Sequence, residues 1–549
     1  MSMHTGPRPT IRLLALLLGL AALVTAGNQI WIRTNVAHVP PGWDQAFYMY
    51  LSLSELELVK AGDVGGLLDF MRTQAPWSGP LVPLATVPFL LGFGATINST
   101  YLVNFPFLFI LLAAATVLAR RLAGAGAGAL TAFFCLTFPA FIAFGRDYLF
   151  ELPLAALTAL TMLLVLETES FRRRGVAVAA GISMGLMVLA KTMGLAFTAV
   201  PIAWATITFI RTKQGPARRN VLLFLLSFVA IASLYYAWNA RAIFGYLAHF
   251  GFGAGAEPWT PVASLLAPRA WTIYLLRIAR RGISLGFAAL FVIILAAASS
   301  KGGRRPTRDD LLLWAWFVAG YIILSLVPNK GGERYALPIL APLAVLMATH
   351  LTCVRQKLLR RCLLGAAIAV GLSNLAYQSL SRRCQYEPRE ILGIPLLEPV
   401  HHTYYFQLFA GASFERSWNP AVLLQALDAL APPSRREIIV MVGARHYFLN
   451  PATIQLYAEL GALGGWLRHR VQVTTASFVG ADEELVKNLM AQSDFIVTRT
   501  SDPGPGAENE STRMLQAMLA SEAPLASFEM TDGASARIYG GGPAAAGGS

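Results

Sequence analysis

Charged residues are scarce in this chain. Only 13% of its 549 residues are Asp, Glu, Lys or Arg, whereas 55% are hydrophobic. A soluble globular protein carries about 25% charged residues, so the scarcity excludes water as the main solvent. Apolar runs recur between short Arg-rich or Pro/Gly-rich breaks, and several approach the roughly 17 to 25 residues that a spanning helix needs. The sequence therefore predicts a polytopic α-helical membrane protein.

Cysteine is also scarce, with four residues in the whole chain. Cys135 lies in an apolar run, while Cys353 and Cys362 flank a basic loop. This spacing excludes a disulfide framework and a CxxC metal motif. The adjacent His401 and His402 are interpreted as incidental, and the sequence predicts no metal site there.

Acidic residues are outnumbered by basic ones, 30 to 44, which gives a formal net charge of +14. The cations lie in clusters between apolar runs rather than along one polar face, so we interpret them as cytoplasmic-loop markers and not as a nucleic-acid surface. The clusters are Arg8/Arg12, Arg120/Arg121, Arg172 to Arg174, Arg211 to Arg219, Lys301 to Arg308 and Arg355 to Arg361.

If every basic cluster lies on the cytoplasmic side, the chain must cross the membrane an even number of times between successive clusters. Eleven helices satisfy this rule, with the N-terminus inside, the C-terminus outside and a long first outer loop at about 33–100. They are expected at 12–32, 101–119, 128–145, 151–167, 175–190, 193–210, 221–243, 283–299, 311–327, 335–352 and 362–380.

Two segments allow alternatives. The first apolar stretch resembles a cleavable signal peptide, but it continues through Ile32 and is predicted to be a helix. Leu81 to Phe93 is apolar, short and interrupted by Pro83 and Pro88. We interpret it as a re-entrant or interfacial segment, because another span would invert every later loop.

The chain changes character after the transmembrane domain, which we place at 1–380. Strands are expected at 437–443, 471–478 and 494–498, and helices at 451–463 and 482–490, which is an alternating pattern. The sequence thus predicts a soluble α/β domain over 381–540, followed by a disordered Gly/Ala-rich tail at 541–549.

The first candidate site follows the first helix. Asp44 is a candidate general base, and Trp43 and Tyr48 are candidate sugar platforms. The alternative is an exposed acid beside an interfacial aromatic belt.

Two further polar groups interrupt apolar sequence. Arg146 and Asp147 precede Glu151, and on one helix the two acids would share a face suited to a cation or to hydroxyls; an ordinary helix start is the alternative. Lys191 lies where two short helices are expected to turn outside. A charge there suggests a ligand or counter-ion, and snorkelling to the interface is the alternative.

Two basic groups fall in predicted outer loops. Lys330, Arg334 and Tyr335 belong to a glycine-flexible loop that suits phosphate recognition. The second group is a cluster of three arginines with i, i+3, i+4 spacing. It lies in a predicted outer loop, against the positive-inside trend, and is either functional or a lipid-headgroup contact. Its members are Arg277, Arg280 and Arg281.

Together, residues 10 to 350 resemble the GT-C superfamily of membrane glycosyltransferases, in particular its protein O-mannosyltransferases and aminoarabinose transferases. The chain departs from that pattern at Gln45, where the family has a second acid, and at Trp77 to Pro80, where it has Lys-Pro-Pro. The matching motifs are Trp43-Asp44-Gln45, Arg146-Asp147 with Glu151, Gly185-Leu186 to Lys191, and Arg334-Tyr335-Ala336-Leu337-Pro338.

The resemblance implies an inverting transfer of a sugar from a polyprenyl-phosphate donor to an acceptor hydroxyl of a glycan, lipid or protein, on the outer face of the inner (plasma) membrane. Asp44 would be the base, and Lys330, Arg334 and Lys191 would stabilise the leaving phosphate. The resemblance identifies no particular cofactor, and a divalent metal stays open. Membrane lipid is the other expected partner. The alternatives are a transporter or flippase of lipid-linked sugars and a non-catalytic membrane scaffold.

Overall fold

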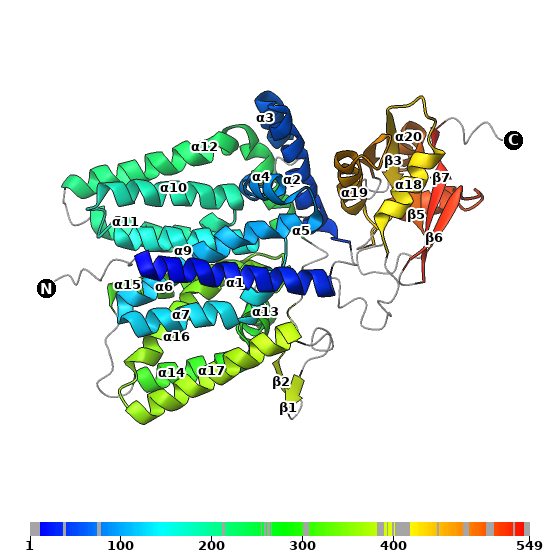
Figure 1. Ribbon diagram of the computed structural model, residues 1–549. Helices are drawn as coiled ribbons and strands as arrows, with labels where there is room; N and C mark the ends of the chain where they lie inside the picture. The colour runs from blue at the N-terminus through cyan, green and yellow to red at the C-terminus, as the bar shows by residue number, and fades with distance from the viewer. Residues whose placement is uncertain are drawn as a thin grey trace. The chain divides into compact units, whose positions relative to one another are not determined.

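A computed structural model describes most of the chain (Figure 1). The described residues are 11–36, 40–73, 78–210, 215–253, 255–256, 260, 264, 266–299, 307–380, 389–391, 394–397, 400, 418–446, 449–475, 482–500, 510–530 and 533–542. The chain forms two compact units. The helical unit comprises Met1–Gln29, Leu68–Val82 and Val103–His402, and the α/β unit comprises Ile30–Leu67, Pro83–Leu102 and Thr403–Ser549.

Apolar helices build the helical unit and lie side by side in Figure 1. In its centre α6 packs between α7 and α9, α9 packs on α10, and α10 packs along α12. The helices are α1 (Ile11–Asn35), α6 (Asn104–Ala123), α7 (Ala125–Thr137), α8 (Pro139–Phe144), α9 (Glu151–Glu167), α10 (Arg174–Ala190), α11 (Gly194–Ile210), α12 (Gly215–Phe252), α13 (Pro268–Arg277), α14 (Leu285–Ala298), α15 (Arg308–Leu326), α16 (Leu337–Cys353) and α17 (Lys357–Leu380).

Six helices in the described part of the chain are long and apolar enough to cross a membrane, or seven if a pair bent by 105° counts as one span. The bent pair is Pro268–Gly282 with Leu285–Ala298. The predicted polytopic membrane fold is confirmed. Ten of the eleven predicted segments each fall on one main helix, whereas the segment 128–145 is divided at Phe138 into α7 and α8. The number of crossings stays a prediction.

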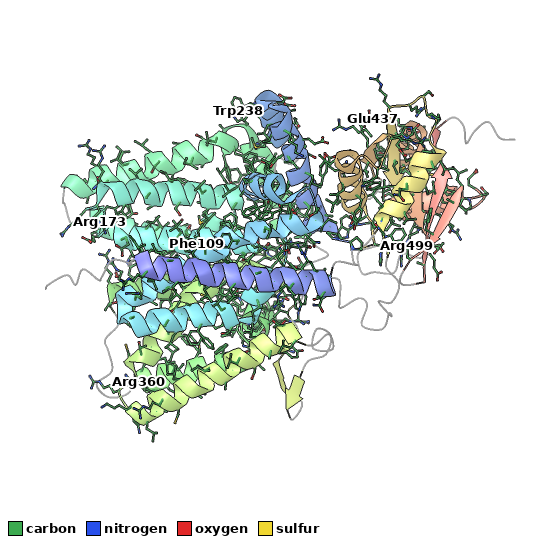
Figure 2. All side chains as sticks on the ribbon, in the orientation of Figure 1. Phe109, Arg173, Trp238, Arg360, Glu437 and Arg499 are labelled. Carbon is green, nitrogen blue, oxygen red and sulfur yellow. The ribbon has the colours of Figure 1, made fainter. Side chains whose placement is uncertain are left out.

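One end of the helical unit gathers basic loops that the sequence predicts to be cytoplasmic. Arg121 bonds Glu167 at 2.9 Å and Asp309 at 3.1 Å, and Arg173 bonds Glu167 at 3.1 Å. Figure 2 shows Arg173 and Arg360 at this same end. Loops from α6, α9 and α15 therefore meet on one side, as an even number of crossings between them requires.

The long first loop is more helical than the sequence suggested. It contains α2 (Trp43–Ala61), α3 (Val64–Thr73), α4 (Leu81–Phe93) and α5 (Ile97–Thr100). Leu81–Phe93 is one continuous helix despite Pro88, and it is shorter than the candidate spans. Its re-entrant or interfacial placement stays a prediction.

The α/β unit carries a five-stranded sheet of order β4-β3-β5-β7-β6. β3 pairs in parallel with β4 and β5, whereas β7 pairs antiparallel with β5 and β6. Glu437 and Arg499, labelled in Figure 2, mark opposite ends of the parallel strands. The strands are β3 (Glu437–Val442), β4 (Arg470–Thr474), β5 (Phe495–Arg499), β6 (Ala526–Glu529) and β7 (Ser535–Gly540).

Helices cover both faces of this sheet. One apolar core joins β3 to α18 (Pro420–Leu430) and α19 (Pro451–Gly464). A second core joins β5 and β7 to α20 (Glu483–Gln492) and α21 (Glu510–Met518). The predicted alternating α/β fold is confirmed, and its boundary at 381 stays a prediction. A separate two-stranded pair, β1 (Arg389–Ile391) and β2 (Ile394–Leu397), precedes the unit.

Three predictions fall wholly or partly outside the described residues. His401 and His402 lie there, as do residues 543–549 of the predicted disordered tail. The end of the strand expected at 471–478 lies there as well, beyond residue 475.

Candidate functional site

A buried carboxylate forms the centre of the candidate site. Glu151 is the first residue of α9 and is 2% exposed, which places its negative charge at the positive end of that helix. The Lys191 ammonium donates to Glu151 Oε1 at 2.6 Å. The Arg334 Nε lies 3.6 Å from the same oxygen. A buried carboxylate is stable only when cations or donors compensate its charge, and two cations do so here.

Short breaks between helices supply both cations. Lys191 stands between α10 and α11 with an extended backbone (φ −162°), so the predicted turn is confirmed. Arg334 and Tyr335 belong to the 3-10 turn Glu333–Ala336, which leads into α16. Such breaks keep the side chains at helix ends rather than on lipid-facing surfaces.

An aromatic ring joins the two cations. Lys191 Nζ lies 5.1 Å and the Arg334 guanidinium carbon 5.0 Å from the centre of the Tyr335 ring. Arg334 also donates to the Tyr335 hydroxyl at 3.2 Å. We call Glu151, Lys191, Arg334 and Tyr335 the Glu151 centre. Its formal charge is plus one, and the Lys191 and Arg334 side chains keep 21% and 26% of their surface exposed, so an anion is the ligand that it suits.

Gly79 of the first loop packs against the end of α10, next to Lys191. A Cβ on Gly79 would lie 2.2 Å from the carbonyl oxygen of Leu189 and 2.6 Å from that of Ala190, at the end of α10. Tyr235 donates its hydroxyl to the carbonyl of Ser78 at 2.7 Å. The backbone at Ser78 and Gly79 therefore packs directly against the helix end that precedes Lys191.

Arg146 is placed differently from its predicted role in substrate binding. It is 6% exposed and donates to Asn28 Oδ1 at 2.9 Å, to the carbonyl of Gln378 at 2.8 Å and to Ser379 Oγ at 2.6 Å. Burial lowers the pKa of its guanidinium, and Asp147 offsets part of this effect. Arg146 thus ties its loop to α1 and α17.

Asp147 does not share a helix with Glu151, so the predicted spacing on one helical face is wrong. α9 begins only at Glu151, and Asp147 lies in the preceding bend. Asn104 donates to the carbonyl of Asp147 at 2.8 Å and to that of Gly145 at 3.2 Å. Side-chain bonds, rather than a helical ladder, hold this loop.

Lys330 points into the protein rather than toward a phosphate. It is 2% exposed, and its ammonium donates to the carbonyls of Leu324 at 3.0 Å and Ser325 at 2.5 Å. These carbonyls belong to the end of α15, where cations are favoured. Burial, followed by the charge of Arg277, lowers the pKa of Lys330 to about 8.

The three outer arginines do not lie on one α-helical face. Arg277 ends α13, whereas Arg280 and Arg281 occupy the π-helical turn η3 (Ile278–Gly282). A π turn changes the angular spacing on which that prediction depended. Arg277 donates to the carbonyls of Lys330 and Gly331, and Arg281 lies 3.7 Å from Glu333. Arg280 lies in the same turn as Arg281.

The acidic motif after the first helix belongs to the α/β unit. Asp44 lies in the first turn of α2, half-buried, with Trp43 before it and Tyr48 one turn later. Trp43 has φ +28°, a conformation that is strained for a non-glycine residue. Such strain often marks functional sites, which agrees with the importance that the sequence assigns to this turn.

Sequence reasoning missed the residues that support the site. Asn28 in α1, Asn104 in α6 and Glu333 all bond site loops. Asn28 and Asn104 were detectable, because polar residues within apolar helices are unusual and commonly functional. Tyr274 was missed too; it is buried with Arg277 and Lys330 at 5.5 and 5.7 Å from its ring.

A divalent metal does not fit the predicted acid pair. Glu151 is already neutralised by Lys191 and Arg334, and Asp147 is not one helical turn away from it. No group of three or more His, Cys, Asp or Glu side chains suited to a metal occurs among the described residues.

The fold resembles that of known membrane enzymes. ArnT from Cupriavidus metallidurans bound to undecaprenyl phosphate superposes with a TM-score of 0.57 at 14% identity, over 96% of this chain and 98% of that one. Its apo structure gives the same score and identity, over 95% and 97%. The Archaeoglobus fulgidus oligosaccharyltransferase gives a TM-score of 0.48 at 15% identity, over 88% and 67%. No family model matches the sequence, and no curated protein matches it either.

The similarity to ArnT, an aminoarabinose transferase, extends over nearly the whole of both chains. The predicted resemblance is therefore confirmed for the fold, which this chain shares with ArnT. The likeness includes the region of the C-terminal α/β unit, for which the sequence motifs gave no family signal.

Proposed function

We propose that this protein is a glycosyltransferase that moves a sugar from a polyprenyl-phosphate donor to an acceptor hydroxyl. The observation that carries the proposal is the Glu151 centre, in which Lys191 and Arg334 leave a net positive charge at the ends of apolar helices. A phosphate attached to a membrane-embedded lipid matches both the charge and the setting. ArnT, which shares the fold, has been crystallised with undecaprenyl phosphate.

The proposed reaction is a direct displacement at the anomeric carbon. The acceptor oxygen forms the new bond to that carbon while the bond from carbon to phosphate oxygen breaks, with inversion. Asp44 receives the hydroxyl proton, and polyprenyl phosphate leaves with the bonding electrons. Lys191 and Arg334 stabilise the growing phosphate charge, and Glu151 orients both. Trp43 and Tyr48 contact the sugar in this scheme.

The roles of two predicted groups change in the proposal. Lys330 is assigned to the end of α15 instead of the leaving phosphate, because its ammonium already bonds two carbonyls. Arg146 and Asp147 are assigned to the support of the loop before Glu151. We further propose that the reaction occurs on the outer face of the inner membrane, with the α/β unit outside.

Purified protein reconstituted into lipid vesicles, with a radiolabelled polyprenyl-phosphate sugar and a cell-envelope acceptor extract, tests the function. Transfer of label coupled to release of polyprenyl phosphate supports the enzyme, whereas movement of intact donor across vesicles without release supports a transporter. Asp44→Asn should abolish transfer. Asp69→Asn, which removes an exposed first-loop carboxylate in α3, is the matched control. Full activity of Asp44→Asn rules out the base assignment.

A further inference from the structure

The α/β unit holds the segment that carries the acidic motif. Thr453, in the first turn of α19, donates its hydroxyl to the carbonyl of Pro41 at 3.0 Å, across 412 residues of sequence. Both residues are buried. A buried carbonyl needs a hydrogen-bond partner, and Thr453 supplies one three residues before Asp44.

The donor is itself fixed in place. The Thr453 amide donates to Asn450 Oδ1 at 3.0 Å, so Asn450 caps α19. Asn450 Nδ2 in turn donates to the carbonyl of His446 at 3.1 Å, just beyond β3. Both Asn450 and Thr453 are fully buried. A continuous set of hydrogen bonds thus links the loop after β3 to Pro41.

The contact continues along the helices. α2 packs against α19 (Figure 1). Near the far end of α2, Glu57 lies beside Glu459 of α19, and Arg470 NH2 lies 3.9 Å from Glu57 Oε2. The C-terminal part of the α/β unit therefore bonds the chain just before α2, at Pro41, and contacts the helix again near its far end, at Glu57, which fixes the direction of the helix as well as its start.

We infer that the C-terminal part of the α/β unit, from Thr403 onward, is a positioning element for the acidic motif, and that Thr453 is its key positioning residue. Trp43 adopts φ +28° between Pro41 and Asp44. A strained backbone of this kind persists only where surrounding contacts hold it. The bond to Pro41 on one side and the α2–α19 packing on the other supply those contacts. The inference rests on the proposed role of Asp44.

The test compares Thr453→Val, which keeps the shape but removes the hydroxyl, with Thr453→Ser, which restores it. Amide hydrogen exchange of residues 43–50 should accelerate about tenfold in the valine variant. A buried carbonyl that loses its hydrogen bond destabilises the local structure by an amount that corresponds to about this factor in the opening equilibrium. The kcat for transfer should fall while the donor KM stays within about twofold. The serine variant should behave like the wild type in both measurements.

Thr512→Val is the matched control, because the buried Thr512 hydroxyl has no hydrogen-bond partner among the described residues. It should change neither measurement. A valine variant with unchanged exchange, or with faster exchange but unchanged kcat, overturns the inference. The exchange measurement requires no activity, so failure of the proposed function remains distinguishable from failure of this contact.

If Thr453→Val does not fold, wild-type protein alone carries the test. In increasing denaturant, amides of residues 43–50 and 453–461 should lose protection in one step with the same denaturant dependence, as a single cooperative unit does. Earlier, independent opening of residues 43–50 would overturn the inference.

Discussion

The position of a carboxylate between two cations sets the chemistry of the Glu151 centre. Without Glu151, Lys191 and Arg334 would repel each other and turn toward water, so the carboxylate both holds them together and reduces their combined charge to plus one. A fully neutral arrangement would lack attraction for a phosphate, and an uncompensated pair would bind it without fixed geometry. Preorganisation of this kind is where enzymes gain transition-state stabilisation.

Replacement of Glu151 tests this interpretation. Glu151→Gln should lower kcat by about a hundredfold, because the cations lose their orientation, while donor KM should stay the same or fall as net positive charge rises. Steady-state kinetics with the lipid-linked donor measures both. Glu167→Gln is the matched control, since Glu167 also pairs with two arginines, Arg121 and Arg173, at the other end of the helical unit. Equal kinetic losses in the two variants would contradict the assignment.

The arginines divide into capture and catalysis in the proposed scheme. Arg280→Ala should raise the donor KM about three- to fivefold with little change in kcat, because a half-exposed ion pair contributes at most about 1 kcal/mol. Arg334→Ala should instead lower kcat about a hundredfold, because charge on the leaving phosphate grows only in the transition state. An unaltered donor KM in Arg280→Ala would leave these arginines as surface contacts.

Sequence reasoning located charged residues well and their partners poorly. It placed Lys191 in a turn between apolar helices, because a charge is expensive anywhere else in such a block. It also assigned Lys330 to a phosphate, but the Lys330 ammonium donates its hydrogen bonds to the carbonyls at the end of α15. A free helix terminus and a ligand phosphate demand the same donor, so composition alone cannot distinguish them.

At the scale of elements, the presence of each helix could be predicted from the sequence, but the positions at which helices bend or change type could not. α9 has the predicted bounds of 151 and 167, since a long apolar run between polar residues leaves one solution. The π turn after α13 and the 105° bend into α14 had no local signal as clear. β6 has only four residues, none of them fully buried, and β7 carries Arg537 in its middle; neither strand was predicted.

Close packing of Ser78 and Gly79 against α10 gives a prediction at this scale. Gly79→Ala would place a Cβ 2.2 Å from the Leu189 carbonyl oxygen, so the end of α10 must shift and carry Lys191 with it. We expect kcat to fall by up to about a hundredfold, as displacements of about 1 Å do at reacting groups. Gly92→Ala in α4, where a Cβ meets nothing within 4 Å, is the control. Unchanged kinetics in Gly79→Ala would contradict the coupling.

At the scale of the whole molecule, two sets of contacts within the helical unit agree with the predicted topology. Arg121, Arg173 and their acids join the predicted inner loops, and Lys191 and Arg334 meet Glu151 from predicted outer loops. Reporter fusions at residues 215 and 430 should therefore report the cytoplasm and the outside, respectively. Cytoplasmic activity of the second fusion would reject the eleven-helix arrangement.

The contact between α2 and α19 should respond to pH through Glu459. Burial first, and the neighbouring Glu57 second, raise the pKa of Glu459 to about 7, although Arg470 partly opposes this shift. The folded contact thus favours protonated Glu459. Because the folded pKa lies above the unfolded value, the stabilisation is fully present below about pH 4.5 and is lost as pH rises through about 7.

Hydrogen exchange of residues 43–50 and 453–461, corrected for intrinsic rates, should therefore show stronger protection at about pH 5 than at about pH 8. Glu459→Gln mimics the neutral side chain, so it should keep the stronger protection at the higher pH. Glu437→Gln, at the exposed start of β3, should leave the pH dependence intact. Protection that is independent of pH in the wild type would mean that water or Arg470 compensates the Glu459 charge, and the α2–α19 contact would then hold the acidic motif equally well at either pH.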